Sequence, residues 1–209
     1  MDAVLLYAWR VPRDGLGHGT SGNLSRRVGA NTVRITPSGI PFPRLSDADL
    51  IDLRVEDGGV LAGHWQPSSE WRLHCALYRQ HPSVHGIVHV HSPFATVFAC
   101  LGRPIEAVHY LIAKVGPRIP VVPYATYGTQ LLAERVSEGL MTSRAVLLEN
   151  HGLVTVGATL AEAYQLALDV EWLAGLYYRT LSIGQPRILD EAEIARVQSA
   201  FRHYGPDRD

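Results

Sequence analysis

Two histidines, His89 and His91, lie two residues apart in the apolar stretch GIVHVHSPF. The β-branched residues around them predict a buried strand within residues 84–92. Residues i and i+2 of a strand point to the same face, so both imidazoles would face one way. Imidazole nitrogens are good ligands for zinc. The pair predicts either a metal site or two hydrogen-bonded core histidines, and it does not decide between them alone.

Two further residues could complete a metal site. His151 lies in LLENHGLV, where a strand runs into a polar bend, and Glu70 lies in PSSEW at the expected start of a helix. A carboxylate at that place is favoured by the helix dipole and can act as a ligand or a base. Three histidines and one carboxylate form a catalytic type of zinc site. The plainer alternatives are a capping glutamate and a turn histidine.

Small polar residues occur at three loops or helix starts. Hydroxyl groups, an amide and free backbone N–H groups at such places can bind an anion, and phosphate is the most common one. Each pair is equally typical of an ordinary turn. The three pairs are Gly22-Asn23, Ser38-Gly39 and Ser68-Ser69.

A glycine pattern in the same region is misleading. Gly17, Gly19 and Gly22 match the spacing of a dinucleotide-binding fingerprint. That fingerprint requires a strand before it and a helix directly after it. Here a helix is expected before the glycines and a strand after them, so the pattern does not predict a dinucleotide site.

The elements that must position these residues alternate between helix and strand. Residues 15–27 are expected to form a Gly-rich loop, and Pro12 is expected to break or kink the first helix. Ser68 or Ser69 is expected to cap the second helix, and Thr159 the long one. Expected helices cover residues 3–10, 68–82, 93–102, 127–141, 159–184 and 189–205. Expected extended segments cover residues 31–39, 49–63, 84–92, 119–126 and 144–157. This pattern predicts an α/β chain with helices covering a sheet.

Length and composition narrow the class of protein. The 209 residues suit one domain over 1–209, and 46% apolar with 19% charged residues is typical of a globular chain. A net charge of -1 gives no basis for binding nucleic acid or a membrane surface. Cys75 and Cys100 have no paired spacing, and no apolar run reaches the roughly 20 residues of a membrane span. A cytoplasmic location is therefore expected.

Seven motifs, taken in their order along the chain, resemble the class II aldolase/adducin family. They are GTSGNLS, ITPSGIP, PSSEWRLH, VHVHS, HYLIAKVG, IPVVPYATYGT and LLENHGLV. Within the family they are most similar to the members that cleave L-fuculose 1-phosphate. The resemblance implies a three-layer α/β/α domain with a central mixed β-sheet. It also implies a homotetramer with active sites at the subunit interfaces.

The resemblance assigns roles to particular residues. It implies that zinc is held by His89, His91 and His151, and that Glu70 both coordinates zinc at rest and acts as the catalytic acid/base. Tyr110 would come from a neighbouring subunit to handle the aldehyde oxygen, and Tyr204 would close over the site. The implied phosphate-binding residues are Asn23, Ser38, Gly39, Ser68 and Ser69.

The implied reaction is the zinc-dependent cleavage of a ketose 1-phosphate to dihydroxyacetone phosphate and a short aldehyde such as L-lactaldehyde. The chain has one lysine, Lys114, which disfavours a Schiff-base aldolase. The alternatives are an aldolase for 5-deoxyribulose 1-phosphate, a pentulose-phosphate epimerase or dehydratase, and a non-catalytic adducin-like binding module. The module would be expected to have lost its metal ligands.

Overall fold

A computed structural model describes residues 1–203. Its strands form a single eight-stranded sheet in the order β4-β3-β2-β1-β5-β8-β7-β6. All neighbouring strands pair antiparallel except β6 and β7, which are parallel, so the sheet is mixed. The strands are β1 Asn23–Gly29, β2 Thr32–Ile35, β3 Ile51–Arg54, β4 Val60–Ala62, β5 Gly86–Val90, β6 Val121–Val122, β7 Ala145–Leu148 and β8 Gly152–Gly157.

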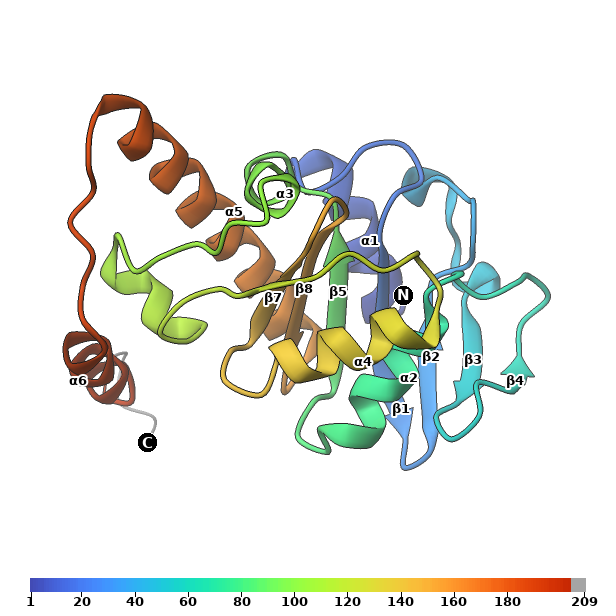
Figure 1. Cartoon of the computed structure of the whole chain (residues 1–209). Coiled ribbons are helices and arrows are strands. Elements are labelled where there is room, and N and C mark those ends of the chain that lie inside the picture. Colours follow the sequence, from blue (N-terminus) through green and yellow to red (C-terminus); the bar gives the residue numbers. More distant parts are fainter. Residues whose placement is uncertain (204–209) are drawn as a thin grey trace.

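Helices cover both faces of this sheet (Figure 1). One face carries α1, α3 and α5, and the other carries α2 and α4, which pack against each other. The α-helices are α1 Ala3–Arg13, α2 Trp71–Gln80, α3 Pro93–Cys100, α4 Gln130–Gly139, α5 Leu160–Ile183 and α6 Glu191–Phe201. The 3-10 helices are η1 Phe42–Arg44, η2 Asp47–Asp49 and η3 Tyr110–Lys114. The expected three-layer α/β/α fold is confirmed.

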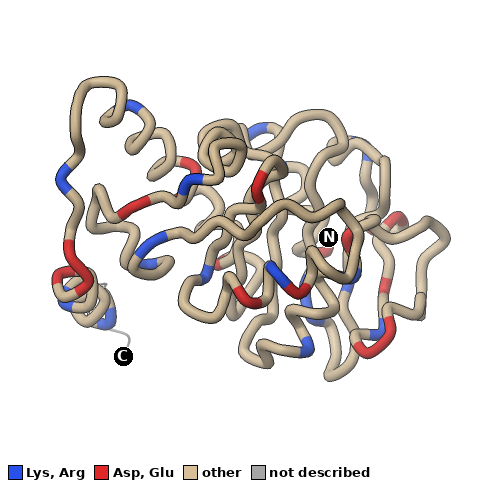
Figure 2. The backbone as a smooth tube through the Cα atoms, in the orientation of Figure 1, with Lys and Arg blue, Asp and Glu red and all other residues tan. Residues whose placement is uncertain are grey.

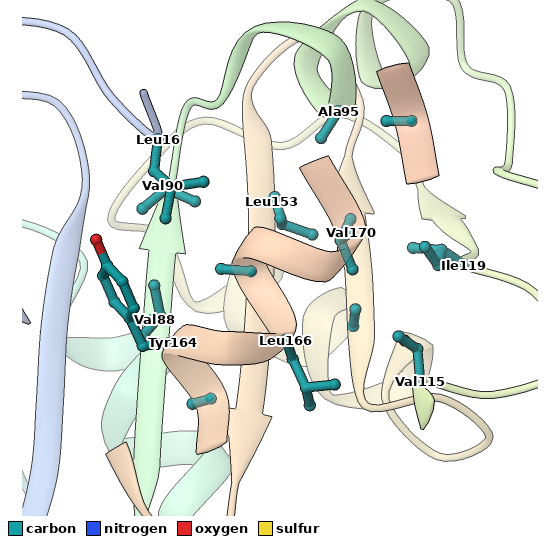
Figure 3. Close-up of a cluster of buried hydrophobic side chains, with 14 of the residues drawn as sticks. Leu16, Val88, Val90, Ala95, Val115, Ile119, Leu153, Tyr164, Leu166 and Val170 are labelled. Atoms are coloured by element: carbon teal, nitrogen blue, oxygen red, sulfur yellow. The ribbon is translucent and has the colours of Figure 1, made fainter. Parts of the chain in front are cut away.

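The alternation of β5 divides its side chains between two apolar cores. Val88 and Val90 face α5 in one core, which also contains Leu153 and Tyr164 (Figure 3). Ile87 lies in the other core, beneath α2 and α4. His89 has the parity of Ile87 and is fully buried on the α2 side of the sheet. One strand therefore supports both cores and carries the histidines to its end.

Several expected elements are confirmed. Within the extended segment expected over residues 49–63, β3 and β4 pair antiparallel, and the expected polar bend joins β7 to β8. Thr159 caps α5 by accepting a hydrogen bond from the Glu162 N–H at 3.1 Å. Pro12 lies in the last turn of α1, which ends one residue later at Arg13.

Two expectations about local structure were wrong. Residues 23–27 are not loop but belong to β1, because pairing with β2 and β5 on both sides outweighs the weak strand preference of this sequence. Neither Ser68 nor Ser69 caps α2; the N-cap is Glu70, and the Ser68 side chain and carbonyl form a turn before the helix. This leaves both serines outside the helix, next to the site described below.

Charged residues of both signs are interspersed along the backbone (Figure 2). Among the helices that the structure describes, none combines the length and apolar character required to cross a lipid bilayer. Cys75 is buried, Cys100 is exposed, and both are free thiols.

Candidate metal centre and active site

Three histidines in or next to neighbouring strands meet at one end of the sheet. His89 lies in β5, His91 directly follows that strand, and His151 is the last residue of the bend between β7 and β8. Asn150 forms that bend with a positive φ of 53°, a conformation that asparagine tolerates better than most residues. The candidate ligand nitrogens of the three rings all lie within 4.8 Å of one another. The structure thus brings together the three histidines that the sequence singled out.

The orientation of His89 is fixed by its backbone neighbour. Its Nδ1 lies 3.0 Å from the carbonyl oxygen of Leu153, so Nδ1–H donates to that oxygen and Nε2 points to the centre. Nε2 lies 3.0 Å from Glu70 Oε2 and 3.1 Å from His91 Nε2. Burial lowers the pKa of His89, but the charge of Glu70 and the hydrogen bonds outweigh it, and the net shift is upward.

Glu70 is a buried carboxylate held from several sides. Its Oε2 accepts from Asn23 Nδ2 at 3.0 Å and lies 3.0 Å from His89 Nε2. Burial raises the pKa of Glu70, but the charges of His89 and His151 and these contacts lower it well below its ordinary value. Its Oε1 is buried without a hydrogen-bond partner among the described residues, and His151 Nε2 is 3.6 Å away. A buried carboxylate oxygen left in this way is available to a cation.

The donor set fits a divalent metal of the zinc type. Burial and the neighbouring histidines lower the pKa of His91 to about 3, and burial and His89 lower that of His151 to about 4. Both imidazoles are therefore neutral near pH 7, which is the form that binds metal. With the unpaired Oε1 of Glu70 beside them, His89, His91 and His151 are the residues that would hold the ion.

A cavity of about 480 Å³ opens beside this centre. Glu70, His91 and His151 line it, whereas the buried His89 lies behind its wall. The same cavity is lined by all five residues for which phosphate binding was expected. These are Asn23, Ser38, Gly39, Ser68 and Ser69.

Glycine is required where the first loop meets the centre. Gly22 has a φ of +92°, and a Cβ there would lie 2.7 Å from the His89 carbonyl oxygen. A side chain would therefore push the loop away from β5. Thr20 and Ser21, which precede Gly22, also line the cavity. Their hydroxyl groups were not among the predicted site residues, although they belong to the GTSGN motif.

Two tyrosines that were not predicted as site residues also line the cavity. These are Tyr124 and Tyr127, and Asn150 lines it as well. Their loop is fastened by a hydrogen bond from the Tyr124 N–H to Glu149 Oε2 at 2.7 Å, and Arg135 donates to the Tyr124 carbonyl. The only signal in the sequence was the motif IPVVPYATYGT, which carries both tyrosines.

Other predicted residues lie elsewhere. Tyr110 begins η3 and is 48% exposed. It is not among the residues of the described chain, 1–203, that line this cavity. Tyr204 lies outside the described residues. Lys114 forms an exposed ion pair with Asp169 at 3.0 Å, and it is not part of the cavity lining. Lys114 is thus not the desolvated lysine that a Schiff base requires.

Comparison with known proteins identifies the family of this fold and site. The sequence model of the family described as class II aldolase and adducin N-terminal domain matches residues 3–178 of this chain. The chain belongs to this family of class II aldolases and adducins.

Individual relatives match the chain over nearly its whole length. The 5-deoxy-D-ribulose 1-phosphate aldolase of Bacillus thuringiensis is 39% identical over 98% of this chain and 96% of the relative. The 5-methylthioribulose-1-phosphate/5-deoxyribulose-1-phosphate aldolase of Rhodospirillum rubrum is 43% identical over 95% of this chain and 89% of that relative. A solved L-fuculose 1-phosphate aldolase superposes with a TM-score of 0.92 at 35% identity, covering 95% of this chain and 94% of that one.

Proposed function

We propose that this protein is a zinc-dependent aldolase that cleaves a ketose 1-phosphate to dihydroxyacetone phosphate and a short aldehyde. One observation carries the proposal: a three-histidine centre with a buried carboxylate lies at a single cavity, which the five residues expected to bind phosphate also line. A phosphorylated sugar needs both parts at once, because its phosphate must be held while its carbonyl is polarised. The aldolase relatives described above support the same class of reaction.

The metal and Glu70 divide the chemistry. A bound zinc ion would act as a Lewis acid on the substrate oxygens and would stabilise the negative charge that develops there. Glu70 lies beside the metal ligands, and its lowered pKa keeps it ionised. As a carboxylate it can take up a proton from a substrate carbon. In synthesis the ionised Glu70 removes a proton from C3 of dihydroxyacetone phosphate, and the C3 electron pair attacks the aldehyde carbon, whose oxygen gains a proton. Cleavage is the reverse, in which the C4 hydroxyl loses its proton and Glu70 returns its proton to C3.

The remaining contacts hold the substrate ends. Side chains of Asn23, Ser38, Ser68 and Ser69, with the backbone at Gly39, surround the place where a phosphate would lie. We further propose a homotetramer in which Tyr110 of a neighbouring subunit handles the aldehyde oxygen. Its phenol would donate a proton to that oxygen in synthesis, and its phenolate would take the proton back in cleavage. Its exposed position in η3 leaves it free for such a contact. We also propose that Tyr204 closes over the site.

The aldehyde part of the substrate distinguishes the candidate sugars. L-Fuculose 1-phosphate would release L-lactaldehyde, and 5-deoxyribulose 1-phosphate would release the two-carbon acetaldehyde. Both keep the same phosphate-bearing half, so the phosphate residues and metal ligands do not separate them. We favour L-fuculose 1-phosphate, with 5-deoxyribulose 1-phosphate as the alternative, which the names of two relatives support.

Two other classes remain as alternatives with defined signatures. A pentulose-phosphate epimerase or dehydratase would use the same metal and phosphate contacts but release no dihydroxyacetone phosphate. A non-catalytic adducin-like module would not need a metal centre. The convergence of His89, His91 and His151 on Glu70 argues against that module.

A coupled assay for dihydroxyacetone phosphate tests the proposal. Metal-loaded protein is mixed with a panel of ketose 1-phosphates, including both candidate sugars, and with a pentulose 5-phosphate. We expect product from at least one ketose 1-phosphate, loss of activity with chelator and recovery with zinc. Release of no dihydroxyacetone phosphate from any sugar by fully loaded protein would contradict the proposal. Epimerised pentulose phosphate would instead support the epimerase alternative.

A further inference from the structure

A column of polar side chains on α2 meets a second column on β1 inside the molecule. Glu70, His74 and Tyr78 recur every four residues, so they share one face at the start of the helix and along it. Asn23 and Ser25 are two residues apart and share one face of β1. All five are buried, and His74 and Ser25 are completely inaccessible to solvent.

These side chains form one continuous chain of hydrogen bonds. The Tyr78 hydroxyl lies 2.9 Å from Ser25 Oγ, which lies 2.6 Å from His74 Nδ1. His74 Nε2 lies 2.5 Å from Asn23 Oδ1, and Asn23 Nδ2 lies 3.0 Å from Glu70 Oε2. The chain begins in the core and ends at the carboxylate of the metal centre.

Only one direction of hydrogen bonding satisfies every member. An ionised Glu70 can only accept, so Asn23 must turn its NH₂ group toward it and its Oδ1 toward His74. His74 must then carry its proton on Nε2, and its bare Nδ1 accepts from Ser25, which in turn accepts from Tyr78. Burial lowers the pKa of His74 to about 3, so the ring is neutral as this pattern requires.

We propose that His74 is a positioning residue that holds the Asn23 amide with its NH₂ group toward Glu70 and the cavity. Glu70 holds the Asn23 amide at its nitrogen and His74 holds it at its oxygen. Without the His74 donor, Oδ1 would be buried without a partner, and the amide would be held at one end only and free to shift. One N–H of Asn23 would support Glu70 and the other would be left for the substrate phosphate. This inference rests on the proposed function, because it takes Asn23 as a phosphate contact.

Two substitutions of His74 separate positioning from simple filling of space. In His74→Gln the side-chain NH₂ reaches the place of Nε2 and can still donate to Asn23. In His74→Asn the amide reaches only the place of Nδ1, so it can contact Ser25 but not Asn23. His81→Gln and His81→Asn are the matched controls, because His81 terminates the same helix and contacts Ser137 away from the cavity.

The measurement is the dissociation constant of inorganic phosphate for the metal-loaded protein, together with KM and kcat for the ketose phosphate. We expect His74→Asn to weaken phosphate binding and raise KM about tenfold, and His74→Gln to stay within about threefold of wild type. Equal phosphate affinity of the two His74 variants, whether both keep it or both lose it, would overturn the proposal. If His74→Asn does not fold, His74→Met, which has no donor, takes its place.

A second readout does not depend on phosphate or turnover. The side-chain amide of Asn23 gives a proton–nitrogen NMR signal whose exchange with water reports its hydrogen bonding. Slow exchange in wild type and His74→Gln, with fast exchange in His74→Asn, supports the positioning role. Identical exchange in all three proteins contradicts it. If wild type shows slow exchange but binds no phosphate, the positioning stands and the proposed role of Asn23 in binding substrate fails.

Discussion

Strand β1 carries two polar networks, one on each face, and they differ in almost every physical respect. On the α2 face, Asn23 and Ser25 belong to the buried hydrogen-bonded chain that leads to Glu70. On the α1 face, Arg26 is bonded to Asp2, the N-cap of α1, at 2.6 Å. The first network consists of neutral groups apart from its carboxylate end, whereas the second consists of ion pairs.

The α1-face network extends across three neighbouring strands. Arg26 on β1 lies opposite Arg34 on β2, which lies opposite Asp52 on β3. Arg34 is bonded to Asp52 at 2.7 Å and to Asp2 at 3.0 Å. Both arginine side chains remain about one third exposed. Such a network fastens the start of α1 to the sheet without directing any group into the cavity.

The difference indicates what each kind of contact can do. A partly exposed ion pair has several equivalent geometries and contributes modestly to the free energy of unfolding. A buried chain of single donors and acceptors has one permitted direction, and reversing any member leaves a buried group unpaired. The α2 face can therefore set the orientation of a functional side chain. The α1 face contributes only attachment.

The largest effect is expected at the functional end of the α2-face network. Glu70→Gln keeps the shape and the acceptance of one hydrogen bond but removes the base, so kcat should fall about a thousandfold. The dihydroxyacetone phosphate assay measures this loss, and zinc content measured in parallel shows whether the metal stays. Glu162→Gln, which alters a surface pair with Arg144, is the control. Activity of Glu70→Gln within a few-fold of wild type would mean that another group is the base.

Metal removal should produce the next largest effect. A ligand that binds only the folded state at a thousand times its dissociation constant stabilises that state by about 4 kcal/mol. For a chain of this size we expect chelator to lower Tm by about 10 °C. Differential scanning calorimetry measures the shift. His151→Ala should show a much smaller change with chelator, and an equal change would place the metal elsewhere.

A smaller effect is expected inside the buried chain. Ser25→Ala leaves the Tyr78 hydroxyl and His74 Nδ1 without their shared partner. We expect the free energy of unfolding to fall by about 2 kcal/mol. Urea denaturation at pH 7 measures it. If Ser25→Ala lowers the free energy of unfolding no more than Asp2→Asn on the α1 face does, the two networks do not differ as we infer.

The smallest effect is expected from Asp2→Asn on the α1 face. Burial raises the pKa of Asp2, but the hydrogen bonds from Arg26, Val4 and Arg34 lower it to about 2. A folded-state pKa below the unfolded value contributes stability above pH 4 that is lost as pH falls toward 2. We expect Asp2→Asn to cost about 1 kcal/mol at pH 7 and nothing near pH 2.

Denaturation curves from pH 7 to pH 2 test the Asp2 prediction. The wild-type protein and the variant should converge as the carboxyl group of Asp2 is protonated. KM for the sugar phosphate should be unchanged at pH 7, because Asp2 does not line the cavity. A tenfold change in KM would show that the two faces of β1 are coupled.

The metal ligands could be predicted from the sequence, whereas the buried hydrogen-bonded residues that hold Glu70 could not. His89 and His91 are two residues apart on a strand, and Glu70 and His151 flank predicted elements, so local spacing was enough to propose them. The role of His74 depends on Asn23, 51 residues away, and therefore on how β1 packs against α2. No local pattern contains that pairing. The wrong prediction that residues 23–27 form a loop also hid the pairing of Asn23 with His74.

Two groups of cavity-lining residues show the same limit. The small polar residues expected to bind phosphate were recognisable because each occurs at a loop or helix start. Tyr124 and Tyr127 reach the cavity only because Gly128 lets their loop approach Ser69, where a Cβ would lie 2.7 Å from the carbonyl oxygen. That close approach is a property of the folded chain. The contributions of Tyr110, Tyr204 and a homotetramer stay predictions.

The most direct test of the account follows a single proton. Dihydroxyacetone phosphate is incubated in D₂O with metal-loaded protein, and NMR measures loss of one hydrogen at C3, the carbon that would join the aldehyde. This step needs the phosphate contacts, the metal and Glu70 but no aldehyde, so the identity of the sugar does not matter. We predict exchange by wild type, its loss with chelator and a fall of about a thousandfold in Glu70→Gln that retains its metal. Exchange at the wild-type rate by metal-loaded Glu70→Gln, or by chelated wild type, would contradict the account.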